Sequence, residues 1–418
     1  MKKRLAIVGT GIAGMASAYF LKDEFDITVF EKDARIGGHT NTVSFDYRGD
    51  EISFDTGFMV FNEVTYPNLI KLFKKLEVDY YDTSMSFSVF NEPMGIEYNG
   101  SSLNGLFSQR KNLVRPSHYK MILNINKFNQ KAPSILADSK YDGMTVAEFV
   151  EDWKLGEEFL HLFLIPMSSA VWSTPAEKML KFPIQSLVRF FFNHGFMGLN
   201  TQHQWKTITG GSKSYRDKLI NSFIDQIKVE DEVLEVLLKD DQVEITSRSG
   251  HSTFDYVIMA SHADQSLKMR KNPTVDELRI LSAFKYQKNM ATIHTDHSIM
   301  PKLKENWSSW NYVTKEKGSA FTVYYMNSLQ KINHPDSFFI NINGEQYVDP
   351  SMIISQIAYE HPVFDIEAVR SQEDVFKILN QEKNRIKYCG AWTRYGFHED
   401  GILSAVRLCS SILGREVL

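Results

Sequence analysis

The sequence predicts an α/β fold whose parallel sheet starts at the first residues of the chain. The apolar run Leu5-Ala6-Ile7-Val8 has the length and composition of a buried parallel strand. A glycine-rich turn follows, and the small residues from Ile12 to Leu21 then indicate a helix that ends at the charged residues 22–24. Ile27-Thr28-Val29-Phe30 is a second strand. Strand, turn, helix and strand form one βαβ unit, for which a right-handed crossover is expected.

The turn is Gly9-Thr10-Gly11-Ile12-Ala13-Gly14, a G-x-G-x-x-G motif directly after a strand and at the start of a helix. Gly9 permits the tight turn, Gly11 lets the backbone approach a pyrophosphate, and Gly14 lets helix and strand pack closely. Glu31 ends the second strand, 22 residues after Gly9, where a carboxylate binds a ribose hydroxyl. The pattern predicts a Rossmann-type dinucleotide site that favours FAD or NAD over NADP.

The N-terminus also imitates a secretory signal peptide, because Lys2-Lys3-Arg4 precedes an apolar run and the small residues 16–18. We favour the βαβ interpretation, since the apolar run contains glycines at dinucleotide-binding spacing and a second strand follows. No run approaches the roughly 18 apolar residues that a membrane span needs.

Composition excludes several other classes of protein. Of the 418 residues 43% are hydrophobic and 23% charged, as in ordinary globular proteins, and a net charge of −4 gives no reason to expect nucleic acid as a partner. Cys389 and Cys409 are too few for a disulfide scaffold, no metal-ligand spacing is present, and a reducing cytoplasm is expected. The sequence says nothing about the oligomeric state.

The segment after the second strand resembles a known fingerprint. Glu31-Lys32-Asp33-Ala34-Arg35-Ile36-Gly37-Gly38-His39-Thr40 is similar to the second fingerprint of the flavin amine oxidase superfamily, which includes monoamine oxidase, protoporphyrinogen oxidase and phytoene desaturase. A permanently charged Arg35 can neutralise pyrophosphate, and Gly37-Gly38 let the backbone pass close to the cofactor. The resemblance implies FAD rather than NAD.

Further segments resemble this superfamily along the whole chain. The resemblance implies that Phe54 to Met59 approach the flavin ring. It also implies that Gly210-Gly211 lie on the flavin side of the site and that Val233 offers its backbone to adenine. Cys389 to Trp392 and Asp400 to Leu403 resemble the strand and helix start that close the site. The expected ligands of a non-covalently bound FAD are Gly9, Gly11, Ile12, Ala13, Gly14, Glu31, Lys32, Arg35, Gly37, Gly38, His39, Thr40, Thr56, Gly57, Phe58, Met59, Gly210, Gly211, Val233, Gly390, Ala391, Asp400, Gly401 and Ile402.

Later strands predict that the nucleotide-binding domain is discontinuous. Residues 229–236 and 243–246 read as a hairpin around Asp240-Asp241, residues 256–260 and 385–388 as strands, and a final helix is expected after Gly401. The intervening aromatic-rich segments do not read as βαβ. We therefore expect an FAD-binding domain from residues 1–62, 206–264 and 379–418, and an α+β substrate domain from residues 63–205 and 265–378.

A narrower resemblance concerns residues 281–301, 307–312 and 325–330. They look like a bacterial family of FAD-binding, amine-oxidase-like proteins often encoded beside cyclopropane-fatty-acyl-phospholipid synthases. This resemblance implies unsaturated or modified lipid acyl chains as substrates, and such chemistry is plausible because a flavin can abstract a hydride beside a double bond.

Two features of the second domain bear on an apolar substrate. Aromatic residues are frequent in residues 163–205, and the segment 189–197 combines bulky apolar residues with turn formers. Arg110, Lys111, Arg115, Lys120, Lys127 and Lys131 alternate with apolar residues, which indicates either transient contact with an anionic membrane surface or a solvated helix face. The first alternative predicts a cytoplasmic protein that is peripheral to the membrane.

Catalytic residues are poorly specified, because hydride abstraction needs no protein nucleophile. His203 and Trp205, just before Gly210-Gly211, are weak candidates, as is His194. The absence of a second G-x-G-x-x-G favours oxygen or a quinone over NAD(P)H as the partner that reoxidises the flavin. Three functions stay open: oxidation, desaturation or isomerisation of acyl chains, amine oxidation, and a non-catalytic flavoprotein that binds lipid or a partner.

Overall fold

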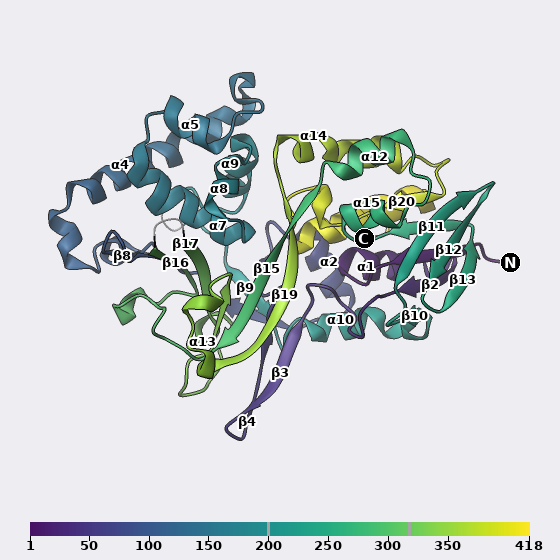
Figure 1. Cartoon of the computed structure of the whole chain (residues 1–418), viewed down its shortest axis with the longest axis horizontal. Coiled ribbons are helices and arrows are strands. Elements are labelled where there is room, and N and C mark those ends of the chain that lie inside the picture. Colours follow the sequence, from purple (N-terminus) through teal and green to yellow (C-terminus); the bar gives the residue numbers. More distant parts are fainter. Residues whose placement is uncertain (199–200, 317–318) are drawn as a thin grey trace.

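The computed structural model describes residues 1–198, 201–316 and 319–418. The molecule is elongated, with the N-terminus at one end and helices α4 and α5 at the other (Figure 1). Two sheets organise it, a parallel sheet near the N-terminus and a larger mixed sheet in the other half.

The parallel sheet confirms the predicted βαβ unit and extends it. Its five strands, in the spatial order β10-β2-β1-β14-β20, are Ile227–Lys228, Asp26–Phe30, Arg4–Val8, Tyr256–Met259 and Ile386–Tyr388. Side chains of successive strand residues point to opposite faces, so Leu5 and Ile7 enter one hydrophobic core while Ala6 and Val8 enter another. This two-sided burial explains the uninterrupted apolar run at the start of the chain.

Helices α1 (Ile12–Leu21) and α15 (His398–Leu413) pack together on one face of this sheet. The predicted start of the last helix after Gly401 is wrong, because α15 begins at His398. The Asp400 carboxylate accepts a hydrogen bond from the Phe397 N–H at 2.9 Å and so caps the first turn. A Cβ at Gly401 would lie 2.6 Å from the Ile12 side chain, so this glycine permits the close helix contact.

The other face is covered by an antiparallel sheet of β11 (Val233–Lys239), β12 (Gln242–Ser247) and β13 (Gly250–Phe254). The predicted hairpin is confirmed, and Asp240 makes its turn with φ of 52°. Its predicted start at Val229 is wrong, because Ile227 and Lys228 pair with β2 instead and Glu230 turns the chain with φ of 55°. Further helices beside this layer are α11 (Ala263–Met269), α12 (Val275–Ser282) and α14 (Ile366–Asp374), whereas α10 (Lys213–Ile220) packs on α1.

A seven-stranded mixed sheet dominates the other half of the molecule. Its order is β19-β15-β18-β17-β16-β7-β8, and β15 and β19 form a long antiparallel ribbon that runs through the middle of the structure (Figure 1). The strands are Ile353–Val363, Lys285–His294, Phe339–Ile342, Ser319–Tyr325, Trp310–Glu316, Phe87–Asn91 and Ile96–Asn99.

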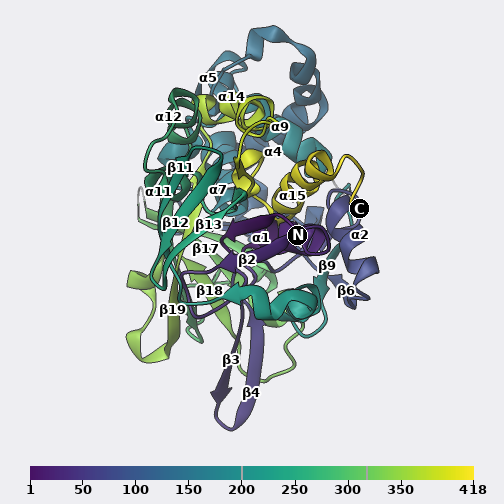
Figure 2. The same cartoon turned by 90° about the vertical axis from the view of Figure 1, so that its right-hand side faces the viewer.

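Helices gather beside the mixed sheet. They are α3 (Leu103–Leu106), the 3-10 turn η1 (Arg110–Val114), α4 (Pro116–Lys131), α5 (Val146–Asp152), α6 (Gly156–Phe159), a π-helical turn (Leu160–Leu164), α7 (Ile165–Trp172), α8 (Ala176–Met179), α9 (Ile184–Asn193) and α13 (Met326–Leu329). Figure 2 shows α4, α5 and α9 above the parallel sheet and a hairpin projecting below it.

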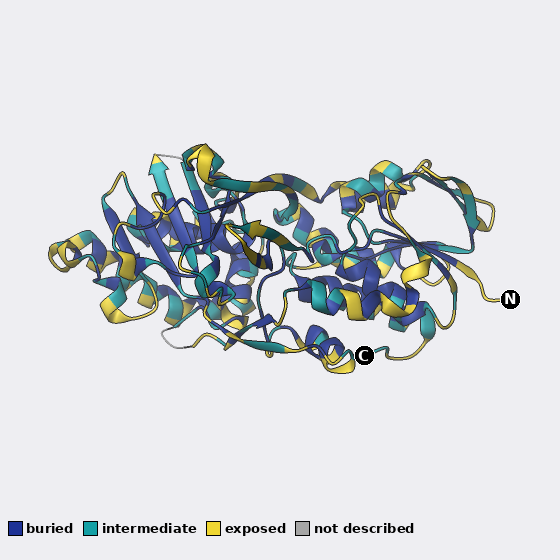
Figure 3. Ribbon diagram, turned by 90° about the horizontal axis from the view of Figure 1, so that it is seen from below, coloured by how far each residue is buried: buried dark blue, intermediate teal, exposed yellow. Residues whose placement is uncertain are grey.

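Smaller elements join the two halves. The projecting hairpin is β3 (Thr42–Tyr47) with β4 (Asp50–Asp55), and a short sheet is made by β5 (Phe61–Asn62), β9 (Trp205–Ile208) and β6 (Tyr80–Thr83). Helix α2 (Pro67–Lys75) packs on α15. Buried residues continue along the interior from one sheet to the other, and exposed residues lie on the outer faces (Figure 3). Within the described residues no helix is long and apolar enough to cross a membrane.

Candidate active site

A cavity of about 790 Å³ extends from the glycine-rich turn into the second half of the molecule. Its lining combines the carboxyl ends of β1 and β2 with residues of α7, α9, β15 and β19. The carboxyl edge of a parallel sheet is the expected place for a ligand in such a fold. The cavity therefore has one end suited to a nucleotide and a second end lined by aromatic residues.

The glycine turn has the geometry that its motif predicts. Gly9 has φ of 101°, which disfavours residues with a side chain, and a Cβ at Gly14 would lie 1.9 Å from the Gly9 carbonyl oxygen. A Cβ at Gly11 would meet nothing within 4 Å. The backbone at Gly11 is thus open to the cavity, directly at the N-terminus of α1, where free N–H groups favour an anion.

Glu31 lies beside this turn at the end of β2. Its carboxylate accepts hydrogen bonds from the Thr10 N–H at 3.0 Å and the Thr10 hydroxyl, and from the Asp33 N–H at 3.0 Å. The side chain is buried but lines the cavity. A fixed carboxylate at this position is suited to accept a hydrogen bond from a sugar hydroxyl.

The loop after Glu31 is fastened by Arg35. Its guanidinium donates hydrogen bonds to the carbonyl oxygens of Thr40 at 3.1 Å and Gly38 at 2.8 Å, and its side chain lines the cavity. Gly38 has φ of 58°, and a Cβ there would lie 3.2 Å from the Gly11 Cα. The two glycine segments predicted from sequence therefore touch each other.

Histidines gather where this loop meets β19. The His39 ring stacks on Tyr359 with 4.9 Å between centroids and lies 5.0 Å from the His361 ring. Burial, with the Arg35 charge, lowers the pKa of His39 to about 4. Burial likewise lowers the pKa of His361 to about 3, with His39 and His262 acting in the same direction. These rings are therefore neutral at pH 7, and they can accept or donate hydrogen bonds to a polar ligand.

His398, the first residue of α15, also lines the cavity. Its ring stacks on Phe58 with 3.8 Å between centroids and an interplanar angle of 5°. Its Nε2 lies 2.7 Å from the Tyr215 hydroxyl and 3.2 Å from the Thr40 hydroxyl. Burial lowers the pKa of His398 to about 3, so this ring also stays neutral.

The far end of the cavity is aromatic. Trp172 ends α7, Phe190 belongs to α9, and the remaining aromatic residues of this end come from five other segments. Phe190 stacks on Phe397 with 4.9 Å between centroids. These aromatic residues are Trp172, Phe190, Phe196, Trp205, Trp310, Tyr324 and Phe397. The acidic side chains of the lining lie at the other end: Glu31 and Asp33 follow β2, Glu232 precedes β11, and Glu360 lies 3.6 Å from His262.

The structure brings most, but not all, of the predicted cofactor ligands to the cavity. Those that line it are Gly9, Gly11, Ile12, Ala13, Glu31, Lys32, Arg35, Gly38, His39, Gly57, Phe58, Met59, Val233, Gly390 and Ala391. Those outside its lining are Gly14, Gly37, Thr40, Thr56, Gly210, Gly211, Asp400, Gly401 and Ile402. Members of the second group contact lining residues: Thr40 lies 3.2 Å from His398, and Asp400 accepts the Phe397 N–H at the start of α15.

One polar network holds Gly210 and Gly211 in place. Both have positive φ, at 77° and 81°. The buried Asp55 carboxylate accepts hydrogen bonds from the Ser212 N–H and hydroxyl at 2.8 and 2.6 Å. Gln330 donates to the same carboxylate at 2.8 Å, which ties the glycine pair to the second half of the molecule. Sequence reasoning missed this role of Asp55 and Gln330.

Two of the three weak catalytic candidates lie outside the lining. His194 Nδ1 lies 2.9 Å from the Phe190 carbonyl oxygen, and His203 Nε2 lies 2.9 Å from the Asn193 carbonyl oxygen. The Asn193 carbonyl ends α9, where a helix leaves such groups without internal partners, whereas the Phe190 carbonyl also accepts the His194 N–H at 3.0 Å. Both histidines therefore hydrogen-bond to the C-terminal end of α9. Trp205 does line the cavity.

Several lining residues had no local signal in the sequence. Tyr359 and His361 lie on β19 and reach the site only because that strand pairs with β15 along its length. Tyr286, on β15, accepts a hydrogen bond from the Ala263 N–H at 3.0 Å and stacks on His262 at 4.3 Å. A contact that depends on long-range strand pairing leaves no periodicity or spacing to read.

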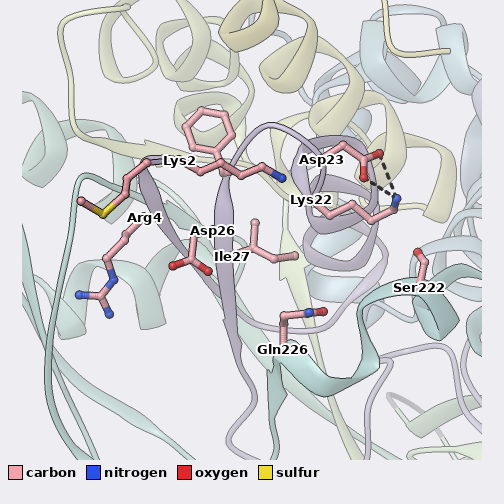
Figure 4. A pocket seen from close by; sticks show the side chains of 10 residues that line it. Lys2, Arg4, Lys22, Asp23, Asp26, Ile27, Ser222 and Gln226 are labelled. Carbon is pink, nitrogen blue, oxygen red and sulfur yellow. Dashed lines mark hydrogen bonds and ion pairs between the residues drawn. The ribbon is translucent and has the colours of Figure 1, made fainter.

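A second cavity, of about 530 Å³, lies near the N-terminus (Figure 4). Lys2, Arg4 and Lys22 share it with Asp23 and Asp26, and Lys22 pairs with Asp23 at 3.0 Å. It lies at the amino ends of β1 and β2, the edge opposite to the glycine turn, so it lacks the backbone amides that the glycine turn offers to a phosphate. Within the described residues no cluster of His, Cys, Asp or Glu could hold a metal ion.

Comparisons with known proteins agree with this geometry. The sequence model of a family described as flavin containing amine oxidoreductase matches residues 12–298. Over 42 residues the chain is 50% identical to protoporphyrinogen oxidase 2 (chloroplastic/mitochondrial) of Arabidopsis thaliana, an alignment that spans 10% of this chain and 8% of that protein.

Solved structures share the fold over nearly the whole chain. Cyclohexylamine oxidase from Brevibacterium oxydans IH-35A superimposes with a TM-score of 0.71 at 14% identity, covering 99% of each chain. A CLA-producing fatty acid isomerase from P. acnes superimposes with a TM-score of 0.67 at 16% identity, covering 96% of this chain and 97% of that one. At these identities the likeness concerns the two-domain fold.

Proposed function

The chain belongs to the family of flavin-containing amine oxidoreductases, and from that premise we propose that it is an FAD-dependent oxidoreductase acting on an apolar substrate, an unsaturated or modified lipid acyl chain. The reaction is hydride abstraction from a carbon of that chain, which leads to desaturation, oxidation or isomerisation. The observation that carries the substrate class is the aromatic end of the cavity.

The residues around the glycine turn fit FAD. The open backbone at Gly11 would receive the pyrophosphate, and the Glu31 carboxylate would accept a hydrogen bond from the adenosine ribose. His39 Nε2 is buried and has no hydrogen-bond partner among the described residues, as expected for a group that would hydrogen-bond to the cofactor. When bound, the flavin supplies a hydride acceptor next to the substrate.

The aromatic end supports an acyl chain. Its side chains exclude water and offer dispersion contacts along a hydrocarbon, while none of them is a carboxylate that would pair with a cationic amine. The fatty acid isomerase of similar fold acts on a hydrocarbon chain by its name. The resemblance to proteins encoded beside cyclopropane-fatty-acyl-phospholipid synthases points in the same direction.

Amine oxidation is the second candidate. Aromatic rings also hold ammonium groups by cation–π attraction, and cyclohexylamine oxidase shares the fold. A new carboxylate in the aromatic end would distinguish the two functions. It would weaken the binding of a hydrocarbon chain, because the charged group holds water in the site, and it would strengthen the binding of an ammonium group.

Ser173 is the position at which to place that charge. It follows α7, lines the cavity beside Trp172 and has φ of 48°, a left-handed conformation that Asp tolerates. We expect Ser173→Asp, loaded with FAD, to bind the fluorescent polyene cis-parinaric acid on the order of tenfold more weakly, since one charged group in an apolar site costs at least about 1.4 kcal/mol. The measurement is a fluorescence titration with displacement by fatty acids and by primary amines.

Phe192→Asp is the matched control, because Phe192 is 56% exposed on α9 and lies outside the lining. It should bind the probe as the unaltered protein does. Displacement of the probe by fatty acids but not by amines supports the proposal. Two results would favour the amine alternative. One is that the unaltered protein does not bind the probe, and the other is that both proteins bind amines with higher affinity than any fatty acid.

A further inference from the structure

The segment that contains η1 and α4 has an unusual charge pattern. Residues 98–137 contain Arg110, Lys111, Arg115, Lys120, Lys127 and Lys131 and no Asp or Glu, in a chain whose net charge is −4. Burial lowers the pKa of His118 within this segment, so that ring adds no charge at neutral pH. The positive charge of this region is therefore local and uncompensated within the segment.

Most of these cations are also free of partners from elsewhere in the fold. In the part of the chain that the structure describes, Arg110, Lys111 and Arg115 have no carboxylate oxygen within 4.0 Å, whereas Lys120 pairs with Glu158 at 3.0 Å. Lys127 is held by the Trp153 carbonyl oxygen at 2.6 Å. Lys131, at the end of α4, likewise forms no ion pair among the described residues, so three of the four unpaired cations lie on η1 and the residue that follows it.

Large apolar side chains are exposed on the same surface. Among the described residues five of the fifteen exposed large hydrophobic side chains lie between Leu103 and Leu123. Val114 is 84% exposed, Leu123 68% and Leu113 48%. Soluble surfaces rarely gather such residues without a partner. We call the surface made by Arg110, Lys111, Leu113, Val114, Arg115, Tyr119 and Leu123 the η1–α4 face.

The η1–α4 face is a fixed surface. The Tyr119 hydroxyl donates a hydrogen bond to the Leu113 carbonyl oxygen at 2.9 Å, and its ring lies 5.5 Å from that of Phe107. His118 Nε2 lies 2.8 Å from the Leu106 carbonyl oxygen, while Met121 and Phe128 anchor α4 in the core. Apolar residues are therefore presented outward while the opposite side of α4 is buried.

We propose that the η1–α4 face docks the protein on an anionic phospholipid bilayer, with Val114 and Leu123 entering the interface and Arg110, Lys111 and Arg115 contacting headgroup phosphates. A bilayer surface accounts for both halves of the pattern, because it offers anionic charge above and hydrocarbon below. Nucleic acid would account for the cations but not for the exposed Val114 and Leu123.

The position of the face suits the cavity. It lies at the end of the molecule opposite the N-terminus (Figure 1). The chain runs from α4 through α6 and the π-helical turn into α7, which packs against that turn and supplies Val171 and Trp172 to the aromatic end of the cavity. The docking surface and the proposed acyl site therefore belong to one helical region.

The test uses the full-length, FAD-loaded protein and cosedimentation with phosphatidylcholine vesicles, with or without a minority of phosphatidylglycerol. We expect binding to the anionic vesicles that added salt weakens, since ions screen charges beyond a Debye length of about 8–10 Å. Changing Arg110, Lys111 and Arg115 together to Glu should weaken this binding at least about tenfold. The matched control changes Lys71, Lys74 and Lys383 to Glu, three exposed lysines elsewhere that alter the net charge equally.

A second variant reports insertion. Val114→Trp places an indole on the face, and its emission should shift to the blue on anionic vesicles and be quenched by brominated lipid. Vesicle binding needs no turnover, so these results stand apart from the oxidation chemistry. The proposal is overturned if the protein binds neutral and anionic vesicles equally, or binds neither. It is also overturned if the two triple variants lose vesicle binding equally, or if the indole emission does not shift. Binding of homopolymeric RNA without binding of vesicles would overturn it as well.

Discussion

At the scale of single residues, Glu31 shows how a sequence motif becomes a site. The carboxylate is buried and fixed by Thr10 and Asp33, so its orientation is set before any ligand arrives. Fixing a group in advance reduces the entropy that binding costs. The position predicted from spacing alone is therefore also a rigid one.

Replacing Glu31 by Gln should weaken FAD retention by about 1.5–3 kcal/mol, because the charged acceptor for the ribose hydroxyl becomes neutral. The measurement is titration of the FAD-free protein with FAD. Glu232→Gln is the control, since Glu232 also lines the cavity but its carboxylate pairs with Arg248 at 2.7 Å. An unchanged FAD affinity in Glu31→Gln would show that Glu31 is not the ribose ligand.

Buried neutral histidines set the response to acid. His294 is fully buried, neither ring nitrogen has a partner among the described residues, and burial lowers its pKa to about 4. Burial similarly lowers the pKa of His194 to about 4 and of His398 to about 3. In the unfolded chain each titrates near its ordinary value of about 6.5.

The unfolded chain therefore binds more protons than the folded protein between about pH 6.5 and pH 4, and the free energy of unfolding must fall as the pH is lowered through this window. Each histidine contributes up to about 1.4 kcal/mol per pH unit. Asp400 opposes the trend, because burial raises its pKa to about 7, and burial also raises the pKa of Asp55, Asp264 and Glu399. Among the described residues these four carboxyl groups stand against seven histidines whose pKa burial lowers.

The check is denaturant unfolding of the FAD-loaded protein at pH 5 and pH 7.5. His294→Phe should lose less stability at pH 5 than the unaltered protein, since the new ring keeps the stacking on Phe339 but does not titrate. His251→Asn, at an exposed position on β13, is the control. Equal acid sensitivity in His294→Phe and the unaltered protein would contradict the assignment.

At the scale of elements, one buried ion pair joins α12 to β11 and β20. Arg270 and Glu277 pair at 3.0 Å, Arg270 also donates to the Val236 carbonyl oxygen of β11, and the Tyr388 hydroxyl of β20 donates to Glu277 at 2.5 Å. Both charged side chains are nearly inaccessible to solvent. The pair fixes α12 against the sheets.

Glu277→Ala should reduce the free energy of unfolding by about 3–5 kcal/mol, because it leaves the Arg270 guanidinium buried without a counter-charge. Glu235→Ala provides the comparison. Its ion pair with Lys271, at 2.9 Å, is largely exposed and should contribute no more than about 1 kcal/mol. Similar losses in the two variants, measured by denaturant unfolding with FAD present, would show that burial does not strengthen this pair.

Element boundaries show where sequence reasoning succeeds. The first strand, the glycine turn and α1 were predictable because all their signals lie within some thirty residues. The start of α15 was not, since its cap depends on the buried Asp400 carboxylate rather than on a Ser or Thr before the helix. The strand near Val229 was misplaced because two residues, Ile227 and Lys228, pair with a different sheet.

At the scale of the whole molecule, the cavity joins two ends of different predictability. Its nucleotide end follows from local motifs and could be anticipated residue by residue. Its aromatic end takes Trp172 from α7, Tyr324 from β17 and Phe397 from the turn before α15, and only the folded chain brings these together. The resemblance had already implied an acyl chain, but which aromatic residues surround it could be learned only from the folded chain.

The central claim is that this cavity presents an acyl chain to FAD. The direct measurement is rapid anaerobic mixing of the FAD-loaded protein with unsaturated fatty acids, phospholipids and primary amines while the visible flavin absorbance is followed. We predict loss of that absorbance with an unsaturated acyl chain, lasting for oxidation or desaturation and transient for isomerisation. The claim would be contradicted if amines alone caused a loss of absorbance, or if no member of the panel caused one.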